Sequence, residues 1–226
     1  LNGRAIDYAR GKVLGGCSSI NGMIYMRGQA RDYDQWRQMG NVGWAWDDVL
    51  PYFRKTEDHY AGGDDMHGAD GEWRVEEPRL SWEILDAFRE ACAEIGIPKT
   101  EDFNGGTNEG AGYFQVNQKR GVRWSAAHAF LHPITHRQNL TVLTKAQAKK
   151  LTVTDGRITG VDFWLDGTDA HAGAAREVVL ASGSVGSPQI LQLSGIGPAA
   201  LLREHGIDVV HELSGVGENL QDHLQI

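Results

Sequence analysis

The sequence predicts a mixed α/β protein, and three observations support this prediction. Strand patterns concentrate in the second half of the chain, whereas helical periodicity is clearest at residues 81–96 and 187–195. Glycine accounts for 29 of the 226 residues and gathers in clusters between these elements, where the backbone must bend tightly or approach another group closely. We therefore expect a small antiparallel β-meander that leads into a strand, a glycine turn and a helix.

Three helices are expected. Ser81 can cap a helix whose apolar residues recur at steps of three and four up to residue 95. Asp47 can open a shorter helix that carries several apolar side chains. The third is expected over residues 187–195, with Pro188 at its first position, where proline's missing N–H has no cost.

Four strands are expected, at residues 140–144, 148–154, 157–164 and 177–181. The second and third flank Asp155 and Gly156, a pair that tolerates positive φ and favours a tight hairpin. Residues 166–173, rich in glycine and aspartate, are expected to form a turn. Residues 177–181 contain three consecutive large apolar residues, which indicates a strand buried on both faces.

Composition excludes several classes of protein. With 41% hydrophobic residues the chain is not a disordered tail, and no apolar run approaches the roughly 18 residues that a membrane-spanning helix needs. The net charge of −8 and the lack of a basic block argue against a nucleic-acid partner. The two cysteines, Cys17 and Cys92, are too few for a disulfide scaffold, so a reducing, cytoplasmic location is expected.

Residues 10–28 have the composition of an anion-binding loop. They contain five glycines, two serines and an asparagine, and no carboxylate that would repel a phosphate. The segment has neither the GxxxxGK[ST] order of a nucleoside-triphosphate loop nor a GxGxxG turn. Its chemistry therefore points to an anion without identifying the ligand.

Residues 178–188 form the second candidate site. An apolar strand pattern ends there in small residues and passes directly into a helix, whose free N–H groups would face the turn. Such a turn can accept an anion or a polarised ring edge. Gly183 and Gly186 are equally consistent with a simple tight connection between strand and helix.

No metal site is expected. His128, His132 and His136 are spaced four residues apart, but Pro133 breaks the helix that would align them. None of these histidines, nor His223, is expected to act as a catalytic base.

Two long motifs resemble the glucose-methanol-choline (GMC) oxidoreductases. The first is R-G-K-V-L-G-G-C-S-S-I-N-G-M-I-Y-M-R-G at residues 10–28, and the second is G-S-V-G-S-P-Q-I-L-Q-L-S-G-I-G at residues 183–197. The run G-V-G-E-N-L-Q-D-H at residues 215–223 is similar to the choline dehydrogenase and alcohol dehydrogenase branch. The resemblance covers essentially the whole chain and implies a partial FAD-binding, Rossmann-like domain with an antiparallel β-meander and a helical extension.

The resemblance also implies which residues contact FAD. The loop 15–19 would lie against the pyrophosphate and ribityl chain, and residues 21–24 beside the flavin ring. Ala148 would lie against the adenine, and residues 183–184 at the strand end that closes over the dinucleotide. The expected cofactor-binding residues are Val13, Gly15, Gly16, Cys17, Ser18, Asn21, Gly22, Met23, Ile24, Ala148, Gly183 and Ser184.

Departures from the family pattern matter as well. Members that link FAD covalently through histidine carry it where this chain has Ile20, so we expect noncovalent FAD. The family's N-terminal GxGxxG turn and its C-terminal catalytic histidine do not occur in this sequence, which indicates an internal fragment with no catalytic residue of its own. The expected domains are 1–118 (flavin loop and helical region), 119–206 (meander, strand, glycine turn and helix) and 207–226 (start of the connection to a substrate domain).

Two functions stay open. In the first, the chain is the central FAD-binding portion of a choline-like dehydrogenase or oxidase that converts a primary alcohol to an aldehyde. In the second, it is a truncated, inactive packing module. The expected partners are a small alcohol and either the missing parts of the enzyme or a second copy of the chain.

Overall fold

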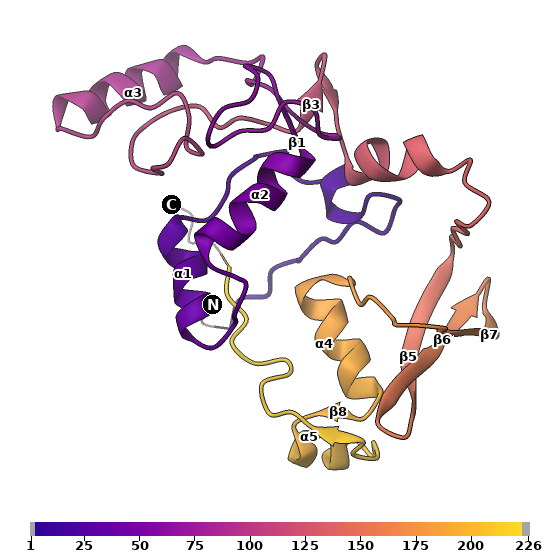
Figure 1. The fold of residues 1–226 in the computed structure, drawn as a ribbon. Helices are drawn as coiled ribbons and strands as arrows, with labels where there is room; N and C mark the ends of the chain where they lie inside the picture. The colour runs from indigo at the N-terminus through magenta and orange to yellow at the C-terminus, as the bar shows by residue number, and fades with distance from the viewer. Residues whose placement is uncertain (1–2, 223–226) are drawn as a thin grey trace. The chain divides into compact units, whose positions relative to one another are not determined.

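A computed structural model describes residues 3–222 and divides the chain into two compact units, residues 1–140 and 141–226 (Figure 1). Both units mix helices and strands, as the sequence predicts. The predicted domain boundaries at residues 118 and 206 stay a prediction.

The first unit is mainly helices and loops with two short two-stranded sheets. Its elements are η1 (Gly16–Ser19), α1 (Ala30–Gln38), α2 (Trp46–Thr56), β1 (Glu57–His59), β2 (Trp73–Val75), α3 (Glu83–Glu94), β3 (Gln118–Lys119), β4 (Val122–Arg123), η2 (Ala127–Leu131) and η3 (His132–Ile134). Strands β1 and β2 pair in parallel, and β3 and β4 pair antiparallel.

Helices α1 and α2 begin in the same way. The Gln29 N–H donates to Asp32 Oδ2 at 2.8 Å, and the Ala45 N–H donates to Asp48 Oδ2 at 3.0 Å. An aspartate in the first turn thus satisfies a backbone donor and complements the positive end of the helix. The predicted helix at Asp47 is confirmed as α2, whereas α1 was not predicted because it buries no side chain and lacks an apolar stripe.

Aromatic packing joins these two helices. The ring of Tyr33 lies 5.3 Å from Trp36, 5.6 Å from Trp46 and 5.8 Å from Phe53, measured between ring centroids. Helix α3 confirms the predicted helix after Ser81, but its N-cap residue is Trp82. Its apolar side chains Ile84 and Phe88 are 70% and 64% exposed.

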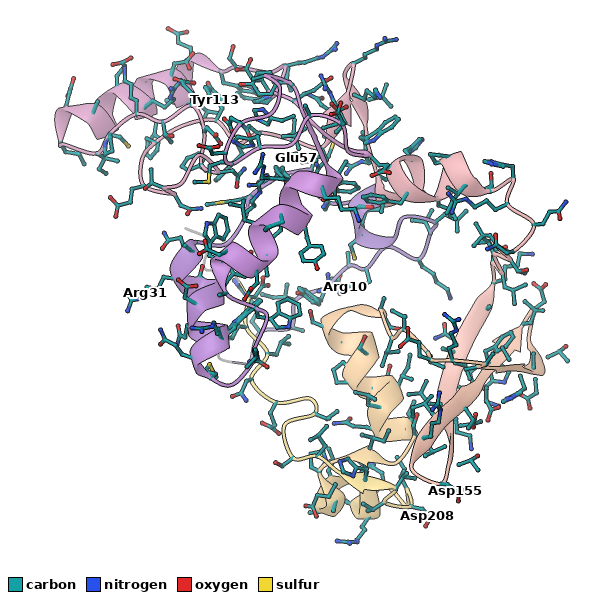
Figure 2. The ribbon with its side chains drawn as sticks, in the orientation of Figure 1. Arg10, Arg31, Glu57, Tyr113, Asp155 and Asp208 are labelled. Carbon is teal, nitrogen blue, oxygen red and sulfur yellow. The ribbon has the colours of Figure 1, made fainter. Side chains whose placement is uncertain are left out.

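The second unit contains the predicted meander. Its elements are β5 (Ala146–Thr154), β6 (Arg157–Leu165), β7 (Thr168–Gly173), α4 (Gly183–Leu193), β8 (Ile196–Gly197), α5 (Ala199–Glu204) and β9 (His211–Glu212). Strands β5, β6 and β7 form one antiparallel sheet in sequence order, and α4 packs against β5 (Figure 1). Asp155, labelled at the tip of the first hairpin in Figure 2, and Gly156 have φ of 50° and 73°, which confirms the tight turn.

Three predictions for strands and turns in residues 140–181 are wrong. Residues 140–144 and 177–181 do not form strands, and Val179 is 82% exposed. A buried strand needs neighbouring strands that pair with its backbone, and none of the described sheets includes residues 177–181. Residues 168–173 form β7 because the turn needs only Asp166 and Gly167.

Helix α4 begins at Gly183, five residues before Pro188, which lies inside it. Proline lacks only its own N–H, so the preceding turn can still be helical. The Ser187 hydroxyl, which was expected to cap the helix, instead accepts the Ser182 N–H at 3.0 Å.

Ser194 is expected to stabilise the contact between α4 and β5. Its hydroxyl accepts the Leu151 N–H at 2.8 Å and donates to the Ile190 carbonyl, and both Ser194 and Leu151 are buried. Ser194→Ala should lower the free energy of unfolding by about 1–3 kcal/mol, because it leaves a buried N–H unpaired. Denaturant titration measures this, with Ser214→Ala at an exposed serine as control. Equal stability of the two variants would contradict the expectation.

Candidate functional site

Residues 13–24 form an irregular loop around the short helix η1. Gly15 has φ of 88°, and a Cβ there would lie 2.5 Å from the Ser19 hydroxyl oxygen. A Cβ at Gly11 would collide with the Gly16 carbonyl. Glycine is therefore required at both positions for the loop to fold back on itself.

The loop exposes an unusual combination of groups. Val13, Ile20 and Ile24 are 56%, 50% and 52% exposed, although large apolar side chains are normally buried. The sequence has no acidic residue between positions 8 and 31 but has four basic ones, of which Arg27 is buried and paired with Glu57, in a chain of net charge −8. This surface suits a ligand that combines a flat apolar ring with an anionic group.

Hydrogen bonds within the loop fix its shape. The Ser18 hydroxyl donates to the Gly15 carbonyl, and the Ser19 hydroxyl donates to the Leu14 carbonyl at 2.8 Å. Asn21 Oδ1 accepts the Met23 N–H at 3.0 Å. Met23 has φ of 64°, a conformation that non-glycine residues rarely adopt, so this bond helps hold a strained backbone.

Residues 115–117 hold the end of the loop by backbone pairing. The Asn117 N–H donates to the Met23 carbonyl at 2.8 Å, and the Tyr25 N–H donates to the Gln115 carbonyl at 2.8 Å. Between them, Ile24 and Val116 form an antiparallel bridge. The loop is therefore anchored to a segment about ninety residues away in sequence.

The loop is held at a second place by residues 123–126. Arg123 Nη1 donates to the Ser18 carbonyl at 3.1 Å and to Asn21 Oδ1 at 3.0 Å, and the Ala126 N–H donates to the Ser18 hydroxyl at 2.9 Å. Sequence reasoning missed Arg123 and Ala126. No local pattern could have found them, because each contact spans more than a hundred residues.

Cys17 lies at the surface of the loop. Its sulfur accepts the Gly11 N–H at 3.5 Å and lies 4.0 Å from Arg10 Nη1; Arg10 is labelled in Figure 2. The Gly11 hydrogen bond and the nearby guanidinium of Arg10 hold the pKa of the Cys17 thiol below its ordinary value. Cys17 is free and exposed, whereas Cys92 is free and buried.

A buried charge cluster, formed by Arg27, Glu57, His67 and Asp102, follows the loop. Arg27 Nη2 lies 2.8 Å from Glu57 Oε1, His67 Nδ1 lies 3.2 Å from Glu57 Oε2, and His67 Nε2 lies 2.8 Å from Asp102 Oδ2. The side chain of Glu57, labelled in Figure 2, is fully buried. The Arg27 N–H also donates to Asn104 Oδ1 at 2.8 Å, so the cluster fixes the chain just beyond the loop.

Electrostatics within the cluster favour a charged histidine. Hydrogen bonds to Asp102 and Glu57 raise the pKa of His67 to about 9. Burial alone would raise the pKa of Glu57, but hydrogen bonds from His67 and the Gly68 N–H hold it below its ordinary value. With His67 protonated, the two cations balance the two carboxylates.

His59 stacks on this imidazolium, with 4.0 Å between ring centroids. Burial and repulsion from His67 lower the pKa of His59, so it is neutral at pH 7. Neither of its ring nitrogens has a hydrogen-bond partner within residues 3–222.

The remaining predicted residues lie in the second unit. Ala148 is on β5 opposite Phe163 on β6, and Gly183 and Ser184 open α4. Gly183 has φ of 81°, and a Cβ there would meet open space. Ser184 also lines a cavity of about 720 Å³ between α4 and residues 215–221.

The predicted contact residues thus fall into two groups, Val13–Ile24 on the loop and Ala148, Gly183 and Ser184 on the second unit. Within residues 3–222 no cluster of three His, Cys, Asp or Glu side chains could hold a metal ion. His128 bonds to the Ser125 hydroxyl at 3.0 Å, and His223 lies outside the described residues. None of the described helices is both long and apolar enough to cross a membrane.

The glycine loop and the glycine turn at α4 are the kind of backbone that a phosphate-containing cofactor can approach closely, and comparison with known proteins gives the family. The family model described as GMC oxidoreductase matches residues 1–225. The chain is 45% identical over 225 residues to the oxygen-dependent choline dehydrogenase of Sinorhizobium fredii, covering 100% of this chain and 41% of that protein. The chain therefore belongs to the GMC oxidoreductase family.

Solved structures agree with this assignment. An FAD-dependent oxidoreductase from Chaetomium thermophilum matches 98% of this chain and 41% of its own, with a TM-score of 0.92 and 33% identity. Pyridoxine 4-oxidase from Mesorbium loti matches 98% of this chain and 44% of its own, with a TM-score of 0.89 and 34% identity. The predicted fold class is confirmed, and the chain corresponds to the N-terminal, FAD-binding region of the family.

The buried charge cluster predicts a loss of stability at high pH. A histidine whose pKa is about 9 when folded and about 6.5 when unfolded stabilises the fold fully below pH 6.5, and this stabilisation disappears as pH rises through 9. Unfolding free energies at pH 6 and pH 10 should differ by up to about 3 kcal/mol more in the natural chain than in His67→Gln. The same pH dependence in both proteins would show that His67 is not protonated.

Proposed function

We propose that this chain is the FAD-binding part of a flavin-dependent alcohol dehydrogenase or oxidase similar to choline dehydrogenase. The observation that carries the proposal is the glycine loop of residues 13–24, which exposes apolar side chains and backbone together. The chain spans 41% of the length of the choline dehydrogenase that it resembles, so the activity of a whole enzyme is part of this proposal.

The loop residues fit FAD in two ways. Within Gly15, Gly16, Cys17 and Ser18, the backbone is open at Gly16, where a Cβ would meet nothing within 4 Å, and Cys17 is exposed. Basic residues and the absence of carboxylates favour a pyrophosphate at this position. Val13 lies on the apolar border of the same loop, 56% exposed.

Residues 21–24 would lie beside the flavin ring. Gly22 has open space around it, and Ile24 presents an exposed apolar side chain. Asn21 and Met23 set the direction of the backbone N–H groups in this segment through the bond between them. Such N–H groups can favour negative charge on a reduced ring.

The second unit supplies the other predicted contacts. Ala148, which is small and half-buried on β5, leaves room for a stacked adenine. Gly183 and Ser184 begin an 11-residue helix whose first N–H groups can bind an anion. The cavity beside Ser184 is of the size that cofactor pockets have.

Bound FAD would supply the hydride acceptor for oxidation of a primary alcohol to an aldehyde. The residues of this chain would bind and orient FAD and exclude water from it. We assign no proton-accepting base to any described residue, because His59 is buried in a stack against His67 and the other described histidines are solvent-exposed or belong to structural hydrogen bonds. The substrate class is taken from relatives named for choline and pyridoxine.

A second function is favoured by the exposed apolar surface. Ile84, Phe88 and Val179 are 70%, 64% and 82% exposed, as expected of faces that pack against another polypeptide. If the chain binds no FAD and self-associates through these faces, it is an inactive packing module. FAD binding by a monodisperse chain would exclude this function.

FAD should protect Cys17 from alkylation. Cys17 is exposed and its thiol is acidified, so iodoacetamide should modify it rapidly in the free chain, whereas buried Cys92 should react slowly. Saturating FAD should slow Cys17 modification at least about tenfold, as peptide mass spectrometry can measure. Equal rates with and without FAD would contradict the loop assignment, and Cys92 provides the internal control.

The linkage to FAD should be noncovalent. Position 20 is isoleucine, whose alkyl side chain cannot bond to the flavin ring. Acid precipitation of a yellow preparation should therefore release all flavin absorbance into the supernatant. Flavin that stays with the precipitated chain would show that another residue forms a covalent link.

A further inference from the structure

We propose that Arg123 is a positioning residue for the glycine loop of residues 13–24, acting through Asn21 on the backbone of Met23. This inference rests on the proposed function, because it concerns the segment that would lie beside the flavin ring. Arg123 does not need to contact FAD to act in this way. Its role follows from the hydrogen bonds that its guanidinium makes to the loop.

Two bonds from one nitrogen define the contact. Arg123 Nη1 donates to the Ser18 carbonyl at 3.1 Å and to Asn21 Oδ1 at 3.0 Å. These acceptors lie at the two ends of the four-residue stretch 18–21, so the guanidinium holds the two ends of this stretch together. A bond to a charged donor is roughly twice as strong as a neutral one.

The same Asn21 oxygen links Arg123 to the backbone of Met23. Asn21 Oδ1 also accepts the Met23 N–H at 3.0 Å, and Met23 has φ of 64°. Without Arg123, the Asn21 side chain could rotate to water and leave the left-handed Met23 without support. The peptide groups between Gly22 and Ile24 would then lose their fixed direction, which is the property a flavin-binding segment needs.

Arg123 is itself held in place. It lies on β4 opposite Gln118 on β3, and its neighbour Trp124 donates its backbone N–H to the Asn117 carbonyl at 2.9 Å. Asn117 in turn donates to the Met23 carbonyl. The chain segment that carries Arg123 is therefore also bonded to Met23 through Asn117. These bonds fix the position of the guanidinium relative to the loop.

The geometry makes a specific prediction about substitutions. Because a single nitrogen makes both bonds, a lysine ammonium with three donors can replace it, unlike a guanidinium that grips a carboxylate with two nitrogens. Arg123→Lys should therefore bind FAD within about threefold of the natural chain. Arg123→Met should bind about tenfold more weakly, because it removes both charge-assisted hydrogen bonds to the loop.

The test combines two readouts on the chain of residues 1–226. FAD affinity is measured by fluorescence titration, and Met23 amide exchange is measured by NMR without FAD. In Arg123→Met the Met23 amide should exchange at least about tenfold faster, and in Arg123→Lys it should stay protected. Arg89→Met on α3, which removes an ion pair to Glu101, is the matched control and should change neither quantity.

A double-variant cycle tests the route through Asn21. If Arg123 acts through Asn21, the loss of affinity in Asn21→Ala combined with Arg123→Met should be smaller than the product of the two single losses. Unchanged Met23 exchange and unchanged affinity in Arg123→Met would overturn the inference. If the natural chain binds no FAD, the proposed function fails, while the exchange of Met23 still decides whether Arg123 positions the loop.

Discussion

The carboxylate of Glu57 is fully buried, and the rest of the first unit is arranged to keep it charged there. Arg27, His67 and the Gly68 N–H all face it. An unpaired buried charge costs several kcal/mol, so each partner must stay in position for the fold to persist. Glu57 lies on β1, and its partners come from the segment after the glycine loop and from the segment between β1 and β2, so the cluster joins three parts of the unit.

The glycine loop depends on this cluster and on two further anchors. Its end is fixed at Arg27 by the cluster and at residues 23–25 by backbone pairing to residues 115–117. Its middle is fixed by the bonds from Arg123 and Ala126 to Ser18. A loop held at these places can keep glycine-rich backbone and apolar side chains exposed without collapsing, which is the preorganisation that a cofactor site requires.

Local patterns predicted much of this molecule. The hairpin at Asp155 and Gly156 follows from the need for positive φ, and α2 and α3 follow from apolar periodicity. The glycine loop could be found because five glycines, two serines and an asparagine lie within residues 10–28, with no carboxylate among them. The outcome at residues 177–181 shows the limit, since an apolar run becomes a strand only when a neighbour pairs with it. Likewise, no spacing rule links Arg123 to Asn21 or His67 to Asp102, because tertiary structure alone brings them together.

The proposed function requires that FAD binds on the glycine loop. Hydrogen–deuterium exchange with mass spectrometry, with and without FAD, tests it most directly because it reports on every backbone segment at once. If FAD binds there, it should slow exchange in residues 13–24 and 183–192 and leave α3 unchanged. Protection confined to other segments, or no protection at saturating FAD, would contradict it.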